Sequence, residues 1–232
     1  ALKIRGTRAN EYKNGAIGGC DGGCVSAALL GDGVCAASLD CPLHLFDGGD
    51  CLGEGCGTHL IISEYVEGAG NNKAVELYNP TGFEADLTRY TLWKLSNGGV
   101  WPDDATARPL EGALAPHETF VFCHTKLMES FDGVCHMQSG GNPMNFNGND
   151  ALFLTFDGLL VDQLGEAGEA PTGGWYVSGV EQATKDHTQR RASHVTMGSS
   201  DWGSASSSEW TVAGQDALDD LGTHTVNQVC AP

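Results

Sequence analysis

The sequence predicts a mainly β protein in two parts, a small disulfide-rich module followed by a β-sandwich. The 232 residues include 33 glycines, and only 18% are charged, which is typical of a turn-rich β protein rather than a helical or disordered one. Six of the 9 cysteines fall within residues 20–56. Residues 58–228 instead contain short apolar runs separated by turn residues.

Runs rich in β-branched and aromatic residues predict the strands of the second part. They lie at residues 58–68, 71–82, 89–99, 118–124, 192–197 and 209–214, and residues 150–165 form a predicted hairpin. The turn of the hairpin is Asp157-Gly158, a strong short-range hairpin signal. About seven short strands with long polar connections are typical of an all-β sandwich. No apolar period of helix length and no fixed-length repeat is found.

The charge of the chain excludes two classes of partner. Its net charge is -18, from 30 acidic and 12 basic residues, and the only basic doublet is Arg190-Arg191. Binding to nucleic acid requires clustered Lys and Arg, and anionic membranes repel an acidic surface. No apolar run has membrane-spanning length, so membrane insertion is not expected. The acidic charge is consistent with a secreted protein, but it can equally have no role beyond keeping the protein soluble.

The cysteine count indicates an oxidising compartment. Clustered cysteines in a segment without a core predict disulfides, and hence a secreted, extracellular protein. Because the count of 9 is odd, at least one thiol is free or links two chains, and Cys230 near the C-terminus is the candidate. No signal peptide opens the sequence, so we expect Ala1 to follow a cleavage site or a trimmed end.

The cysteine-rich segment also carries closely spaced carboxylates. The candidate metal ligands are Asp32, Asp40, Asp47 and Asp50, all near glycines or cysteines. Glycine allows turns that direct several oxygens to one point, and neighbouring carboxylates repel each other unless a cation joins them. Hard oxygen ligands in such loops suit Ca²⁺, which would also stabilise a module without a core. Alternatively, the aspartates cap turns and bind no ion.

Two motifs in this segment resemble those of a Notch-type LNR module. They are Asp32-Gly33-Val34-Cys35 and Asp47-Gly48-Gly49-Asp50-Cys51, and the likeness covers about 35 residues. The resemblance implies one bound calcium, with Asp47 and Asp50 as side-chain ligands and Asp40 at the central acidic position. It also implies a Cys35–Cys51 disulfide.

The segment departs from the LNR pattern at two points. Ala36 follows the third cysteine, where the family usually has aspartate. Five cysteines precede residue 52 where the family has six, and Cys56 is the candidate for the sixth.

The second part resembles a secreted lamin-tail-like domain, an immunoglobulin-like β-sandwich. The likeness begins at residues 60–95, continues at residues 148–166 and 186–195, and ends at residues 219–225. Such domains usually bind or scaffold other molecules rather than catalyse reactions, and some secreted ones are attached to nucleases. The whole chain is therefore expected to be mainly β, an immunoglobulin-like β-sandwich preceded by a small disulfide-rich calcium-binding module.

Acidic residues of the β region offer a second candidate cation site. Glu64 and Glu76 fall on neighbouring predicted strands, with Glu67 and Asn72 in the loop between them. These groups can bind a cation, or they can satisfy backbone groups and pair with Lys73.

The pairs Cys123-His124 and Cys135-His136 contain the residue types of a zinc site. Adjacent residues of a strand point to opposite faces, however, so a Cys123–Cys135 disulfide is the preferred interpretation.

Three tryptophans, Trp101, Trp175 and Trp202, lie in Gly- and Asp-rich loops. They either stack on a sugar or pack in the core.

We expect three regions: an N-terminal arm at residues 1–19, an LNR-like calcium and disulfide module at residues 20–56, and a lamin-tail-like sandwich at residues 57–232. No hydrolase, metalloprotease or P-loop motif is found. The predicted function is that of an extracellular, non-enzymatic structural or adhesion protein, stabilised by Ca²⁺, that mediates assembly in a matrix or attachment to a surface. Its expected partners are further copies of itself, another extracellular protein or a glycan. The alternatives are a substrate-targeting accessory module of a secreted hydrolase such as a nuclease, and a carbohydrate-binding module.

Overall fold

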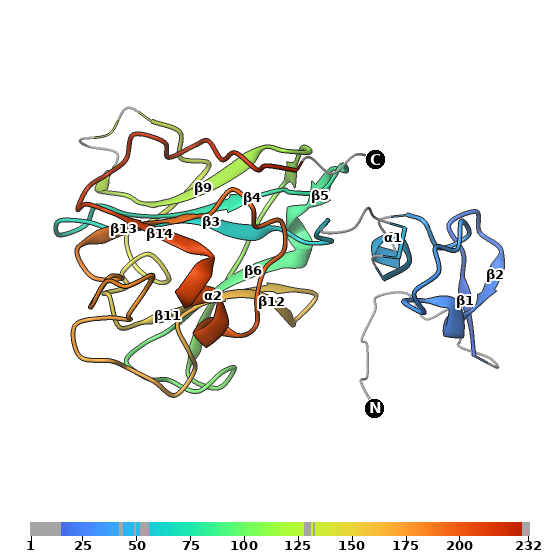
Figure 1. Ribbon diagram of the computed structural model, residues 1–232, viewed down its shortest axis with the longest axis horizontal. Helices are drawn as coiled ribbons and strands as arrows, with labels where there is room; N and C mark the ends of the chain where they lie inside the picture. The colour runs from blue at the N-terminus through green and yellow to red at the C-terminus, as the bar shows by residue number, and fades with distance from the viewer. Residues whose placement is uncertain are drawn as a thin grey trace. The chain divides into compact units, whose positions relative to one another are not determined.

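The computed structural model describes residues 15–41, 44–48, 50, 51, 56–127, 131 and 133–228. The chain divides into two compact units, Ala1–Glu54 and Gly55–Pro232 (Figure 1). Most of the predicted N-terminal arm lies outside the described residues. Its last residues belong to the first unit, where Ala16–Gly18 form strand β1.

The first unit contains little regular structure and is joined by disulfides. Strand β1 pairs with β2 (Cys24–Ser26) in an antiparallel hairpin, followed by the 3₁₀ turn η1 (Ala27–Leu29) and the single helical turn α1 (Leu45–Gly48). The disulfides Cys20–Cys41 and Cys35–Cys51 connect these loops. Among the described apolar side chains of this unit, only Leu39 is fully buried. The disulfides therefore provide much of the stabilisation that a hydrophobic core provides in a larger domain.

The second unit is an immunoglobulin-like β-sandwich of two main sheets. The larger sheet has the order β10 (Met137–Ser139), β9 (Thr119–His124), β4 (Lys73–Tyr78), β3 (Ile61–Glu67), β13 (His187–Arg191), β14 (Trp210–Ala213). The smaller sheet has the order β12 (Leu159–Leu164), β11 (Ala151–Phe156), β6 (Tyr90–Leu95), β7 (Ala105–Pro109). The short strands β5 (Ala85–Asp86) and β8 (Ala113–Leu114) pair separately, and the remaining elements are η3 (Leu87–Arg89) and α2 (Trp202–Ser208). The prediction of a mainly β fold is confirmed.

Most of the predicted strands are present, with one error. The predicted strand at 192–197 is wrong: the strand lies just before it, as β13, and Val195 N–H then donates to the Ala192 carbonyl in a turn. The sequence also gave no signal for α2, because its serines are poor helix formers. This helix begins after Asp201, whose side chain accepts a hydrogen bond from Ser204 N–H.

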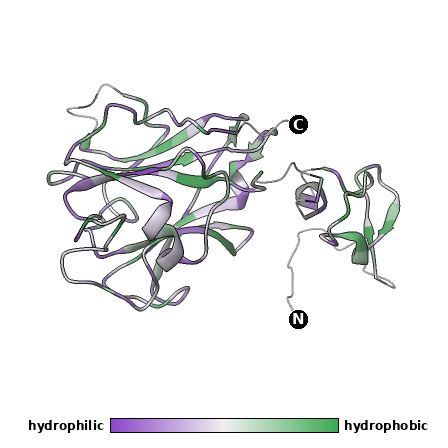
Figure 2. Ribbon diagram, viewed as in Figure 1, coloured by the Kyte–Doolittle hydropathy of each residue, from purple (hydrophilic) through white to green (hydrophobic). Residues whose placement is uncertain are grey.

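The main core lies between the two sheets. Tyr65, Val75 and Phe122 follow one another in register across β3, β4 and β9, and each is at most 1% exposed. Leu92 and Leu154 are register partners across β6 and β11 in the smaller sheet and are equally buried. Figure 2 shows hydrophobic stretches on strands of both sheets. Strands β3, β4, β9 and β11 are buried along their whole length, so the sequence indicates them by runs of β-branched and aromatic residues rather than by strict alternation.

A buried ion pair joins the two sheets. Arg191 of β13 contacts Asp162 of β12 at an Nη1–Oδ2 distance of 3.1 Å, and both side chains are fully buried. The Asp162 carboxylate also accepts hydrogen bonds from the backbone N–H groups of Ile62 on β3 and Ser199. Three segments from distant parts of the sequence are thus connected by one side chain.

The outer face of the larger sheet is covered by residues 214–228, called the C-terminal segment below. Its Leu221 belongs to a second apolar cluster, formed with Val66, Ala74, Val121, Cys123 and Leu127. Gly222 N–H donates to Glu76 Oε2 at 2.6 Å, and the Gly222 carbonyl accepts from Thr119 Oγ1 at 2.8 Å. In Figure 1 the chain after β14 runs along the face of the sheet that carries β9 and β4.

Replacing Asp162 with asparagine removes the fully buried counter-charge of Arg191 and leaves its guanidinium only the partly exposed carboxylate of Glu209. We expect the free energy of unfolding to fall by about 3–5 kcal/mol, measured by urea denaturation of the full chain. The control is Asp157→Asn, which removes a more exposed ion pair with Arg89 and should cost less than about 1 kcal/mol. Equal losses in the two variants would contradict this role for the buried pair.

Candidate functional site

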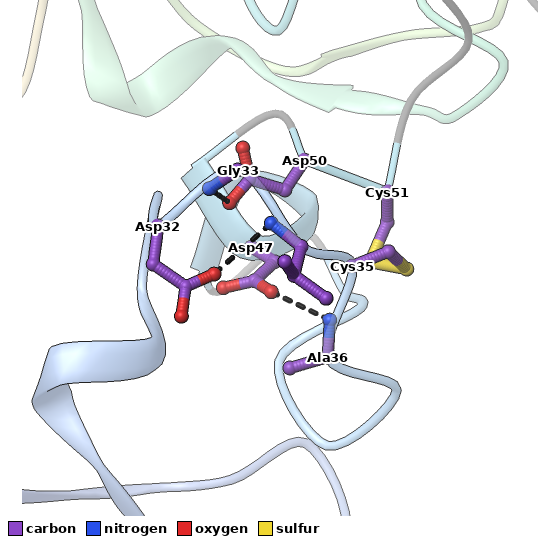
Figure 3. The surroundings of a disulfide bond; sticks show 8 residues. Asp32, Gly33, Cys35, Ala36, Asp47, Asp50 and Cys51 are labelled. Atoms are coloured by element: carbon purple, nitrogen blue, oxygen red, sulfur yellow. Dashed lines mark hydrogen bonds between the residues drawn. A yellow bond between two sulfur atoms is a disulfide. The ribbon is translucent and has the colours of Figure 1, made fainter.

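Three of the four predicted metal ligands converge on one short backbone segment, residues 33–36. Asp32 Oδ1 accepts a hydrogen bond from Val34 N–H at 3.0 Å, and Asp50 Oδ2 accepts one from Gly33 N–H at 2.7 Å. Asp47 Oδ2 accepts from Ala36 N–H, also at 2.7 Å. Figure 3 shows these carboxylates around the loop, beside the Cys35–Cys51 disulfide.

Asp47 is the most deeply buried of these carboxylates. It is 0% exposed, and its second oxygen, Oδ1, has no hydrogen-bond partner. Asp47 and Gly48 have φ angles of 60° and 65°, a left-handed turn that aspartate and glycine tolerate better than most residues. A buried carboxylate oxygen without a donor is energetically costly, and a cation is one way to compensate it.

Asp40 does not share the backbone contacts of the other three. Its carboxylate lies within 4.8 Å of the sulfurs of Cys35 and Cys51. Those sulfurs form a disulfide and are not the thiolates that bind metals. The same argument applies to the second group of potential ligands found among the described residues, Cys20, Cys41 and His44. Carboxylate oxygens are therefore the candidate metal ligands among these side chains, and oxygen ligands suit Ca²⁺.

The cysteines pair partly as the sequence indicated. The Cys35–Cys51 disulfide implied by the resemblance is present. Cys56 is disulfide-bonded, but it does not pair with Cys24, which is exposed and has a free thiol. A third disulfide of the first unit, between Cys24 and Cys56, is therefore not formed. Cys230, the predicted unpaired cysteine, lies outside the described residues.

The Cys-His pairs of the sandwich form no zinc site. Cys123 and Cys135 make the predicted disulfide, with a Cα–Cα distance of 5.8 Å. The histidines have other roles: His136 Nδ1 accepts a hydrogen bond from Val121 N–H, and His124 Nδ1 accepts one from Lys126 N–H.

The acidic residues of the second candidate cation site are only partly brought together. Glu64 and Glu76 face each other as register partners on β3 and β4. Glu67 instead pairs with Lys73, and the Asn72 amide donates to Asp216. The structure therefore favours the alternative in which these groups pair with Lys73 and other protein groups over one in which all four surround an ion.

Glu64 and Glu76 lie on the outer face of the sheet, under the C-terminal segment, and are 2% and 0% exposed. Burial, with the negative charges of Asp220 and Glu76, raises the pKa of Glu64 to about 8 despite the opposing charge of Arg190. Burial likewise raises the pKa of Glu76 to about 7, although Ser63 and Gly222 donate hydrogen bonds to it. Both carboxyl groups therefore hold protons well above the pH at which exposed glutamates ionise.

The loop tryptophans do not form a sugar-stacking platform. Trp175 and Trp202 are 8% and 3% exposed, and their rings meet edge to face. Trp202 contacts Trp210 in the same way, and Trp101 packs against Trp93. Core packing is the interpretation that the structure supports for these residues.

Comparison with known proteins gives a family match for part of the second unit. Residues 57–168 match the Lamin Tail Domain (LTD) family. This confirms the lamin-tail prediction for that part of the chain; the match ends after β12, and β13, β14 and the C-terminal segment follow it. A search of curated proteins found no match. Within the described ranges, no helix has the length and apolar character needed to cross a membrane.

The raised pKa of Glu64 predicts a pH dependence of stability. Between about pH 4.5 and pH 8 the folded protein keeps a proton on Glu64 that the unfolded chain has released. Stability therefore falls as the pH rises through this window, with a slope of at most about 1.4 kcal/mol per pH unit for this group.

In Glu64→Gln the side chain cannot ionise, so this loss of stability with rising pH should disappear. The free energy of unfolding of the variant should therefore rise relative to that of the wild type as the pH increases from 5 to 8. Urea denaturation at several pH values measures the difference. The exposed Glu84 provides the control, and Glu84→Gln should follow the wild-type pH profile. Parallel profiles for wild type and Glu64→Gln would refute the assignment.

Proposed function

We propose that this is an extracellular, non-enzymatic structural or adhesion protein whose first unit is an LNR-like module stabilised by one Ca²⁺. The observation that carries the proposal is the unsatisfied, fully buried Oδ1 of Asp47. The carboxylates of Asp32 and Asp50 accept hydrogen bonds from the same backbone segment as Asp47, residues 33–36. The other oxygen of Asp47 is held by Ala36 N–H, so the carboxylate has a fixed orientation.

Ca²⁺ would supply the positive charge that these carboxylates lack. Asp32, Asp47 and Asp50 would hold the ion, with Asp40 as the further predicted ligand. Because these residues come from both sides of the Cys35–Cys51 disulfide, one ion would link the same loops as the covalent bond. This arrangement supports a structural rather than a catalytic role for calcium.

An extracellular location is supported by the disulfides in both units, which form and persist in oxidising compartments. A scaffolding role is supported by the lamin-tail match of the sandwich. The proposed partners are a second copy of this chain, another extracellular protein or a glycan.

Calcium binding is tested with Asp47→Asn and the matched control Asp21→Asn. Asp21 lies in the same unit but caps a separate turn, accepting a hydrogen bond from Gly23 N–H. We expect the wild type and Asp21→Asn to bind Ca²⁺ in isothermal titration calorimetry. Asp47→Asn should bind at least about tenfold more weakly, a loss of ~1.4 kcal/mol. Unchanged affinity in Asp47→Asn would contradict the site.

The assembly role is tested separately by size-exclusion chromatography with light scattering, in calcium and in a chelator. A larger, defined species in calcium supports assembly controlled by the first unit. A monomer in both conditions, with only the melting temperature changed, would refute calcium-dependent self-assembly and leave calcium as a structural ion.

The free thiol of Cys24 offers a covalent route to assembly, because it is exposed and the odd number of cysteines requires one without an intrachain partner. We expect a disulfide-linked dimer after oxidation, absent in Cys24→Ser and after reduction, in the intact mass spectrum. A wild-type spectrum that shows only monomer with a free or capped thiol would exclude this linkage.

A further inference from the structure

The C-terminal segment is attached to the outer face of the larger sheet mainly by polar contacts. Among the described side chains of this segment, only Leu221 is buried. Beside it, Gly222 N–H donates to Glu76 Oε2 at 2.6 Å. Asp220 forms an ion pair with Arg190 of β13. With a single buried apolar anchor, the attachment of the segment depends on the protonation and charge of the groups beneath it.

Two carboxyl groups meet between the sheet and the segment, Glu64 from β3 and Asp220 from the segment. Glu64 Oε1 and Asp220 Oδ1 are buried, and neither accepts a hydrogen bond from a well-aligned N–H or O–H group of the described residues. The Arg190 guanidinium lies beside both, with Nε 3.6 Å from Glu64 Oε1. The two carboxyl groups hydrogen-bond to each other, and a carboxyl group donates only when it carries a proton. One shared proton therefore completes this contact.

Glu64 is the member of the pair that holds the proton. Burial, together with the negative charges of Asp220 and Glu76, raises the pKa of Glu64 to about 8. Burial also raises the pKa of the partly exposed Asp220, but Arg190 and the hydrogen bond from Glu64 oppose this rise. At neutral pH, a protonated Glu64 thus donates to an ionised Asp220.

The other charged and titratable groups around Glu64 come from β4, β13 and the segment. Glu76 of β4 has its pKa raised by burial to about 7, so it loses its proton in the same direction as Glu64. Arg190 of β13 stays charged. In the segment, the hydrogen bond from Arg190 lowers the pKa of Asp219, and burial lowers the pKa of His224 to about 4. Asp219 therefore stays ionised and His224 stays neutral while Glu64 titrates.

We propose that the hydrogen bond between Glu64 and Asp220 is a proton-dependent latch, which holds residues 218–224 on the sheet and releases them as Glu64 ionises. Without the proton, two buried carboxylates repel each other, and detachment of the segment lets water hydrate both. The main core lies on the opposite face, between the two sheets, so residues 218–224 can open while the sandwich stays folded.

The direction of the pH dependence follows from the proton that opening releases. In the closed state Glu64 keeps its proton up to about pH 8, whereas in the open, hydrated state it returns to its ordinary pKa of 4.5. The opening equilibrium constant should therefore rise by up to about tenfold per pH unit between about pH 5 and pH 8 for this group. Above that range Glu64 is ionised in both states, and the dependence should level off.

The experiment measures amide hydrogen exchange of the full chain by mass spectrometry from pH 5 to pH 9, corrected for the intrinsic pH dependence of exchange. Peptides that contain residues 218–224 report opening of the latch, and peptides from β4 report unfolding of the sheet. In Glu64→Gln the side-chain amide donates to Asp220 at every pH. The variant Asp220→Ala removes the acceptor, and Glu84→Gln on the exposed surface is the matched control.

We expect the protection of residues 218–224 in the wild type and in Glu84→Gln to fall at least about tenfold between pH 5 and pH 8, while β4 stays protected. Glu64→Gln should lose most of this fall, and Asp220→Ala should expose the segment already at pH 5. Protection that does not change with pH in the wild type, or an equal fall in Glu64→Gln, would overturn the proposal. A parallel loss of protection in β4, or wild-type protection in Asp220→Ala at pH 5, would overturn it as well.

Discussion

The ion pair between Arg191 and Asp162 connects three strands of the sandwich that come from separate parts of the sequence. Asp162, on β12, binds the guanidinium of Arg191 on β13 and accepts a backbone hydrogen bond from Ile62 on β3. Both charged side chains are fully buried, so each is costly to bury without the other. The residues that match the Lamin Tail Domain family include Asp162 but not Arg191. Segments beyond the match are therefore part of the same folded unit.

The position of Arg191 also determines that of Arg190, because adjacent residues of a strand point to opposite faces of the sheet. Arg191 points between the sheets, and Arg190 points outward to the carboxylates of the C-terminal segment. The basic doublet is thus divided between two environments and is no patch for a polyanion. The same outward direction brings the Arg190 guanidinium beside the buried carboxyl group of Glu64.

The first unit depends on a different constraint. Without an extended apolar core, its loops are joined by two disulfides and by carboxylates that accept hydrogen bonds from residues 33–36. A structure of this kind has few apolar contacts to lose, and it buries the Asp47 carboxylate completely.

The sequence by itself predicted the mainly β fold, most of the buried strands and the Cys123–Cys135 disulfide, and the resemblance to an LNR module implied the Cys35–Cys51 disulfide. Local signals sufficed there, because periodicity, turn residues and short motifs act over a few residues. Only the tertiary structure decided which carboxylates meet. It directed Asp32, Asp47 and Asp50 to one loop, left Asp40 beside a disulfide, and separated Glu67 from Glu64. It also showed that Cys24 has a free thiol, in contrast to the other cysteines that the structure describes, and that residues 214–228 cover Glu64 and Glu76. These outcomes depend on contacts between residues far apart in the chain, and no local pattern encodes them.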